Sequence, residues 1–68
     1  MQNQTSRVRF LNNRANQLFN HTMAVSSDRA EAILDGSQVF LWAAEIQGLD
    51  GAELAGLNIA RCAWMATK

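Results

Sequence analysis

The side chains that could support catalysis are few and do not form a known arrangement. Ser26 and Ser27 follow His21, the single histidine, by a few residues. A nucleophilic serine needs a base and an orienting group within hydrogen-bond distance, and no glycine-rich turn or strand presents these serines. Serines just before a helix are commonly N-terminal caps. We therefore expect Ser26 and Ser27 to be caps, and we expect no catalytic residues and no enzymatic activity.

Metal and cofactor sites are not predicted either. His21 has no second histidine or cysteine at ligand spacing. Cys62, the single cysteine, cannot form an intrachain disulfide and lies in an apolar stripe, which predicts a buried core thiol. The four glycines stand singly, so no phosphate-binding loop is present. The acidic residues fit helix starts or solvent-facing positions. We expect no metal and no cofactor.

The two tryptophans are the stronger functional candidates. Trp42 interrupts a polar helical stripe, and Trp64 shares a stripe with Leu57, Arg61 and Lys68. Tryptophan and arginine are over-represented at binding hot spots. We therefore predict that Trp42, Trp64, Arg61 and Lys68 contact a partner protein. The alternative is that each ring packs at the core edge or across a dimer, with Arg61 or Lys68 stacked on Trp64.

The elements that must position these residues are predicted to be helices. Asp28 with Glu31, and Asp50 with Glu53, have the spacing of capping boxes, and Gly48 suits a helix end. These signals predict hairpin helices over 28–47 and 51–67, packed antiparallel. Apolar residues at helical spacing predict a basic, polar helix over 6–22, with 1–5 frayed and 23–27 as a connection. The expected fold is a single small all-α domain over 1–68.

Apolar residues on these helices exceed what one hairpin needs. The helix over 28–47 carries two adjacent apolar stripes. The stripe of the helix over 51–67 consists of Ala52, Ala55, Ile59, Cys62 and Ala66. A helix that is apolar on two sides needs two neighbours, so we predict a homodimeric helix bundle. Its expected interface residues are Val39, Phe40, Ala43, Ile46 and Ile59. The alternative is a compact three-helix monomer that uses both stripes.

Length and composition favour the same conclusion. The chain has 68 residues, 49% of them hydrophobic and 18% charged, with no net charge. That content is too apolar for disorder, and so short a chain is marginally stable alone, which leaves oligomerisation as the main support. No apolar run reaches bilayer length and no signal peptide is evident. We expect a cytoplasmic protein without a membrane partner.

The zero net charge conceals an asymmetry. Residues 1–27 carry Arg7, Arg9 and Arg14 and no acid, so this part has a charge of +3, while residues 28–68 have −3. This basic arm could bind a protein or a nucleic acid. It could also dock on the acidic hairpin, within the chain or across a dimer, because opposite charges steer association.

One segment partly resembles the helix-turn-helix of phage repressors and Cro proteins. In residues 19–36, Met23–Ser26 looks like the turn of that family, Ala30 and Ile33 like inward positions of the recognition helix, and Gly36 like its end. The resemblance implies that Ser27, Asp28, Arg29 and Ala32 face the major groove of DNA. The acids of this helix oppose phosphate binding, which needs positive charge.

The sequence therefore favours a non-enzymatic protein-binding module: a small homo-oligomeric regulator, inhibitor or adaptor that acts on an unidentified protein through a helical surface. The alternative is a Cro-like DNA-binding regulator, with nucleic acid ranked second among partners.

Overall fold

The chain folds into helices, as the sequence predicted. The computed structural model describes the backbone of residues 2–68 and the side chains of residues 7–46 and 48–68. Within this part the chain forms three helices and no strand: α1 (Gln2–Ser26), α2 (Arg29–Gln47) and α3 (Gly51–Ala66). The expected all-α class is therefore confirmed.

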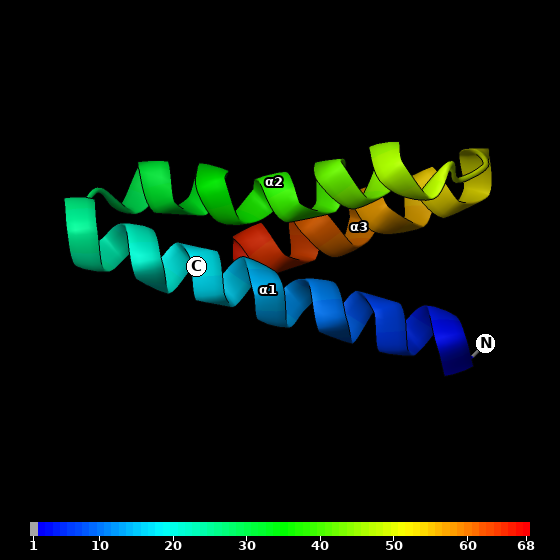
Figure 1. The fold of residues 1–68 in the computed structure, drawn as a ribbon, viewed down its shortest axis with the longest axis horizontal. Coiled ribbons are helices and arrows are strands. Elements are labelled where there is room, and N and C mark those ends of the chain that lie inside the picture. The colour runs from blue at the N-terminus through cyan, green and yellow to red at the C-terminus, as the bar shows by residue number, and fades with distance from the viewer. Residues whose placement is uncertain (1) are drawn as a thin grey trace.

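The helices form two layers. In Figure 1, α1 and α2 run along one another, and α3 crosses behind them. Each helix contacts both others. Helix α1 is longer than the range 6–22 expected for it, so the first connection is 27–28 rather than 23–27. Met1 lies outside the described residues, and the fraying of 1–5 stays a prediction.

Side-chain caps begin α2 and α3 where the sequence placed them. The Asp28 carboxylate accepts a hydrogen bond from the backbone N–H of Glu31 (3.3 Å), but the Glu31 side chain accepts from the Ser26 hydroxyl (3.2 Å). The reciprocal capping box is complete at α3, where Asp50 and Glu53 bond each other's backbone N–H. Such caps satisfy donors that a helix start leaves without partners.

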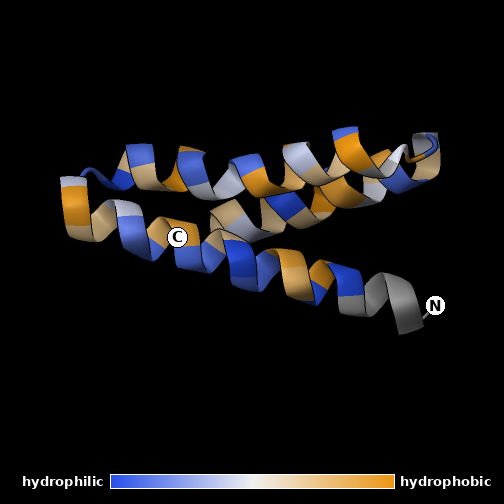
Figure 2. Ribbon diagram, viewed as in Figure 1, coloured by the Kyte–Doolittle hydropathy of each residue, from blue (hydrophilic) through white to orange (hydrophobic). Residues whose placement is uncertain are grey.

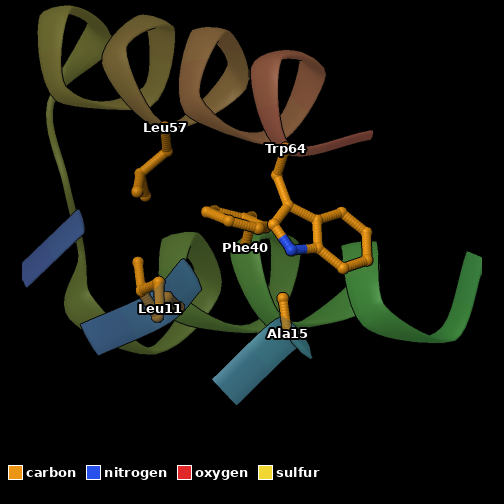
Figure 3. Packing of buried hydrophobic residues seen from close by; sticks show 6 residues of the cluster. Leu11, Ala15, Phe40, Leu57 and Trp64 are labelled. Atoms are coloured by element: carbon orange, nitrogen blue, oxygen red, sulfur yellow. The ribbon is translucent and has the colours of Figure 1, made fainter. Parts of the chain in front are cut away.

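The core lies between α3 and the α1–α2 pair. Figure 3 shows Leu57 and Trp64 of α3 facing Leu11 and Ala15 of α1 and Phe40 of α2. The side-chain hydroxyl of Thr22 donates to the Asp35 carboxylate (2.9 Å), and this partly buried bond joins α1 to α2.

Helix α3 presents a different face to the core from the one expected. Leu57 and Trp64 are buried, and the whole predicted stripe, including Cys62, is exposed. The expectation of a buried thiol at Cys62 was therefore wrong. Hydrophobic stabilisation is proportional to the apolar surface removed from water. Because leucine and tryptophan side chains bury far more apolar surface than alanines and a cysteine do, the face with Leu57 and Trp64 packs on the core.

Hydrophobic and hydrophilic residues alternate along α1 and α2 (Figure 2). Among the described residues, none of the helices combines the length and apolar character needed to cross a bilayer.

Candidate functional site

An open groove lies between α1 and α2. Its volume is about 750 Å³, and no residue of α3 lines it. We call it the α1–α2 groove. Helix α1 contributes Phe10, Leu11, Arg14 and Leu18, and helix α2 contributes Gln38, Val39, Leu41, Trp42 and Glu45.

Helical spacing explains why these side chains share one face. Phe10, Arg14 and Leu18 follow one another at intervals of four on α1, which places them in a single row. The neighbouring row, with Leu11 and Ala15, is buried against the other helices. Helix α1 is therefore apolar on two sides: one row builds the core and the other forms a wall of the groove.

Large apolar side chains in the groove are open to solvent. Phe10 is 59% exposed and Trp42 is 60% exposed, and Leu18 and Leu41 are also exposed. An aromatic side chain can bury roughly 150–250 Å², so the two rings leave on the order of 200–300 Å² uncovered. Large apolar side chains that line one groove and stay exposed to solvent make the groove a candidate interaction site.

The walls of the groove carry opposite charges. The charged residues of α1 with described side chains are Arg7, Arg9 and Arg14, all exposed. Helix α2 carries a net charge of −2, from Arg29 against Glu31, Asp35 and Glu45. Within the groove itself, Arg14 stands on the α1 wall and Glu45 on the α2 wall. The Arg14 guanidinium also donates to the Gln17 side chain of its own helix (3.1 Å).

Trp42 occupies the surface position expected for it, but Trp64 does not. Trp64 is only 5% exposed, and its indole N–H donates to the Asn16 side-chain oxygen (2.8 Å). Its ring meets Phe19 edge-on (centroids 6.2 Å apart) and packs at a tilt on Phe40 (6.4 Å). The surface position expected for Trp64 is therefore corrected: the ring is a core residue of the monomer.

Lys68 lies beside Trp64, and neither Lys68 nor Arg61 lines the groove. The Lys68 ammonium lies 5.0 Å from the centroid of Phe19 and 5.4 Å from that of Trp64. This cation–π contact is the arrangement that the core-edge interpretation described. Arg61 is half-buried beside α2, where it lines a smaller cleft between α2 and α3.

The five residues expected at a dimer interface occupy different environments. Phe40 and Ala43 lie in the core of the monomer, so they are not available to a second copy. Val39 is half-buried and lines the α1–α2 groove, while Ile46 and Ile59 are exposed outside it. The expected interface is thus not one surface, because Phe40 and Ala43 are buried in the core.

The basic arm is part of a continuous helix, and the packing around it differs from a helix-turn-helix. In that motif the second helix crosses the first at roughly 90–120°, whereas α2 runs along α1 (Figure 1). Ala32, which the resemblance placed against DNA, is fully buried. Its burial follows from the packing of α2 on α1.

Ser26 and Ser27, considered as candidate nucleophiles, each form a local hydrogen bond. Ser26 accepts a hydrogen bond from the Asp28 backbone N–H (3.3 Å), and Ser27 donates to the Met23 carbonyl (3.4 Å), so both hydroxyls serve the connection between α1 and α2. In the part of the chain that the structure describes, no three residues among His, Cys, Asp and Glu are grouped as metal ligands.

Sequence reasoning missed Phe10, Leu18 and Leu41 as members of a shared site. The available signal was that α2 carries two apolar stripes and only one can face the core. Helix α1 shows the same pattern, because Phe10 and Leu18 form a second apolar row beside the buried row of Leu11 and Ala15.

Comparison with known proteins found no match among protein families, curated proteins or solved structures. The evidence for a function is therefore the geometry of this chain.

Proposed function

We propose that this chain is a non-enzymatic protein-binding module, a small regulator, inhibitor or adaptor that acts through a helical surface. In this proposal α2 and α3 form an antiparallel hairpin, and α1 packs along α2 to complete the binding groove. The observation that carries the proposal is the α1–α2 groove, with exposed Phe10 and Trp42 in its walls.

The kind of ligand that fits this groove is a helix. On the opposite face of the same two helices, α3 inserts Leu57 and Trp64 between α1 and α2. The groove has the same two helices as walls, and a hydrophobic groove between helices accepts the apolar face of an amphipathic helix. The preferred partner therefore presents a helix with large apolar side chains one or two turns apart.

Trp42 is the expected anchor of binding. A tryptophan that becomes buried at the centre of an interface commonly contributes 2 kcal/mol or more, measured by truncation to alanine. Trp42 is largely exposed, so its removal disturbs the fold little.

An affinity capture experiment with matched variants tests this function. The tagged protein is used as bait in a lysate of the cells that encode it, and a captured protein is then purified and titrated by calorimetry. Trp42→Ala weakens that affinity by about thirtyfold or more. Ile59→Ala, which truncates an apolar residue that is 71% exposed outside the groove, leaves it unchanged.

Far-UV circular dichroism verifies that both variants remain helical. The groove is rejected as the binding surface if the Trp42→Ala variant binds the captured protein as tightly as the wild type does. It is also rejected if Ile59→Ala weakens that affinity as much as Trp42→Ala does.

A further inference from the structure

We propose that the occupant of the α1–α2 groove is a second copy of this chain, so that two grooves close on each other around a two-fold axis with α1 of each copy against α2 of the other. This inference rests on the proposed function, because it takes the same groove as the binding surface. It replaces the expected interface through Phe40 and Ala43, which the core occupies.

Charge complementarity favours this pairing over the alternatives. Helix α1 presents the exposed Arg7, Arg9 and Arg14, of which Arg14 lines the groove, and α2 has a net charge of −2, to which the groove residue Glu45 contributes. When α1 lies on the partner's α2, opposite charges meet twice because of the symmetry. When α1 lies on the partner's α1, the arginines of the two copies meet, and like charges disfavour that arrangement.

The charges inside the groove are self-complementary as well. Arg14 and Glu45 stand on opposite walls of one groove. The proposed two-fold axis exchanges the walls, so each Arg14 lies over the α2 wall of the partner that carries Glu45. An interface related by a two-fold axis requires such a match of a surface with itself, and the groove provides one charge of each sign.

The available area is close to what a stable dimer needs. The molecule measures 36 by 20 by 19 Å between its outermost Cα atoms. A rectangle of 36 by 20 Å has an area of roughly 700 Å², which is of the same order as the accessible surface of about 800 Å² that each partner buries in a standard stable interface. Each copy then covers the exposed Phe10, Leu41 and Trp42 of the other.

The outer face of α3 is a weaker candidate for pairing. Its exposed stripe is made mainly of alanines, with Ile59 as its one large side chain. Burial of alanine removes little apolar area from water, and stabilisation follows that area. The groove offers two exposed aromatic rings and two exposed leucines instead.

Sedimentation equilibrium of the full chain tests the pairing. The wild type gives twice its 7.5 kDa monomer mass at high micromolar concentration. Trp42→Ala raises the dimer dissociation constant by about thirtyfold or more, and Ile59→Ala leaves it unchanged. A wild type that stays at monomer mass throughout overturns the proposal. So does a dimer that loses stability with Ile59→Ala but not with Trp42→Ala.

A charge exchange between two variants makes the test specific for the geometry. Arg14→Glu alone and Glu45→Arg alone each place like charges across both halves of the dimer, so each weakens self-pairing by about tenfold. In an equimolar mixture the two variants form a heterodimer in which both cross-pairs are again opposite in charge. A dimer mass that returns when the two variants are mixed supports the proposal. If only one of the two variants weakens the dimer, or if the mixture stays at monomer mass, the placement of α1 against the partner's α2 is overturned.

These outcomes separate self-pairing from the proposed function. A monomeric wild type whose affinity for a captured protein still depends on Trp42 overturns the second copy as occupant and leaves the function standing. If Trp42→Ala weakens the dimer but leaves the affinity for a captured protein unchanged, self-pairing through the groove is supported. The groove is then rejected as the binding site for the captured protein.

Discussion

At Gly36, α2 lies close to the Trp64 ring of α3 and to the backbone of α1. A Cβ atom at this position would lie 2.8 Å from Cζ2 of Trp64 and 2.9 Å from the carbonyl oxygen of Ala15, and it would overlap the Trp64 Cη2 atom. Glycine in a helix interior costs about 1 kcal/mol relative to alanine. Here the glycine is required, because no other residue leaves room for the indole.

Gly36→Ala therefore destabilises the fold by about 1–3 kcal/mol, since the cost of overpacking exceeds the gain in helix propensity. Gly51→Ala is the matched control, because a Cβ there meets nothing within 4 Å. Urea denaturation measures both free energies of unfolding. Equal effects of the two substitutions contradict the role of Gly36.

Ser27 holds an unusual backbone conformation between α1 and α2. Its φ is 63°, in the left-handed region, and its hydroxyl bond to the Met23 carbonyl is long at 3.4 Å. Left-handed geometry costs an L-residue about 1–2 kcal/mol, and glycine avoids most of that cost.

Ser27→Gly is therefore expected to stabilise the chain by about 0.5–1 kcal/mol, after the lost hydroxyl bond and the greater freedom of the unfolded glycine are subtracted. Gly48→Ala is the opposite change at the connection between α2 and α3. It replaces a glycine with a residue that has a Cβ atom where φ is 60°, so it should destabilise the chain. Thermal unfolding checks both; a lower melting temperature for Ser27→Gly would contradict the expectation.

At the residue scale, prediction from sequence succeeded where the signal was local. Asp28, Gly48 and Asp50 act through neighbours within three residues, so their spacing alone indicated the helix ends. The environment of Trp64 was not local: its partners Asn16 and Phe19 lie more than forty positions away. No spacing within α3 indicates which distant helix covers the ring.

At the scale of elements, one partly buried bond links α1 to α2. The Thr22 hydroxyl donates to the Asp35 carboxylate at 2.9 Å, and Thr22 is almost fully buried. A hydrogen bond to a charged group contributes more than one between neutral groups.

Thr22→Val keeps the shape of the side chain and removes the donor, so it lowers the free energy of unfolding by about 1–2 kcal/mol. Thr22→Ser keeps the hydroxyl and serves as the control, with a smaller loss from the missing methyl group. Guanidinium denaturation compares the two; a valine variant as stable as the wild type would show that the bond is not needed.

The helices themselves followed from the sequence, but their rotation did not. Both faces of α3 have helical spacing, one with Ala55, Ile59 and Cys62 and the other with Leu57 and Trp64. The second face also carries Arg61 and therefore resembled a surface.

The cation–π contact of Lys68 keeps a charged group at the core edge, where its ammonium can remain near water.

At the scale of the whole molecule, large apolar side chains of the α1–α2 pair lie both in the core and in the groove. One face holds the core with Leu11 and Phe40, and the other exposes Phe10 and Trp42 in the groove. The excess of apolar helical surface was visible in the sequence. Which face would remain open was not, because that depends on where α3 packs.

Self-pairing through this face couples folding to concentration. Association that favours the folded chain raises its apparent stability by mass action. The melting temperature of the wild type should therefore rise over about a hundredfold range of concentration, and that of the Trp42→Ala variant should not. Scanning calorimetry measures both, and a wild-type melting temperature independent of concentration argues against a dimer.

Gly36 is the one glycine in α2, and this fixes the register of α3. A helix surface repeats with each turn, so a packed helix can in general slide by about 5.4 Å and find similar contacts. Along α2 only one position lacks a Cβ, and the Trp64 ring fills it. Positions 36 and 64 should therefore vary together: a smaller ring in Trp64→Phe should recover part of the stability lost in Gly36→Ala, as a double-mutant cycle would measure.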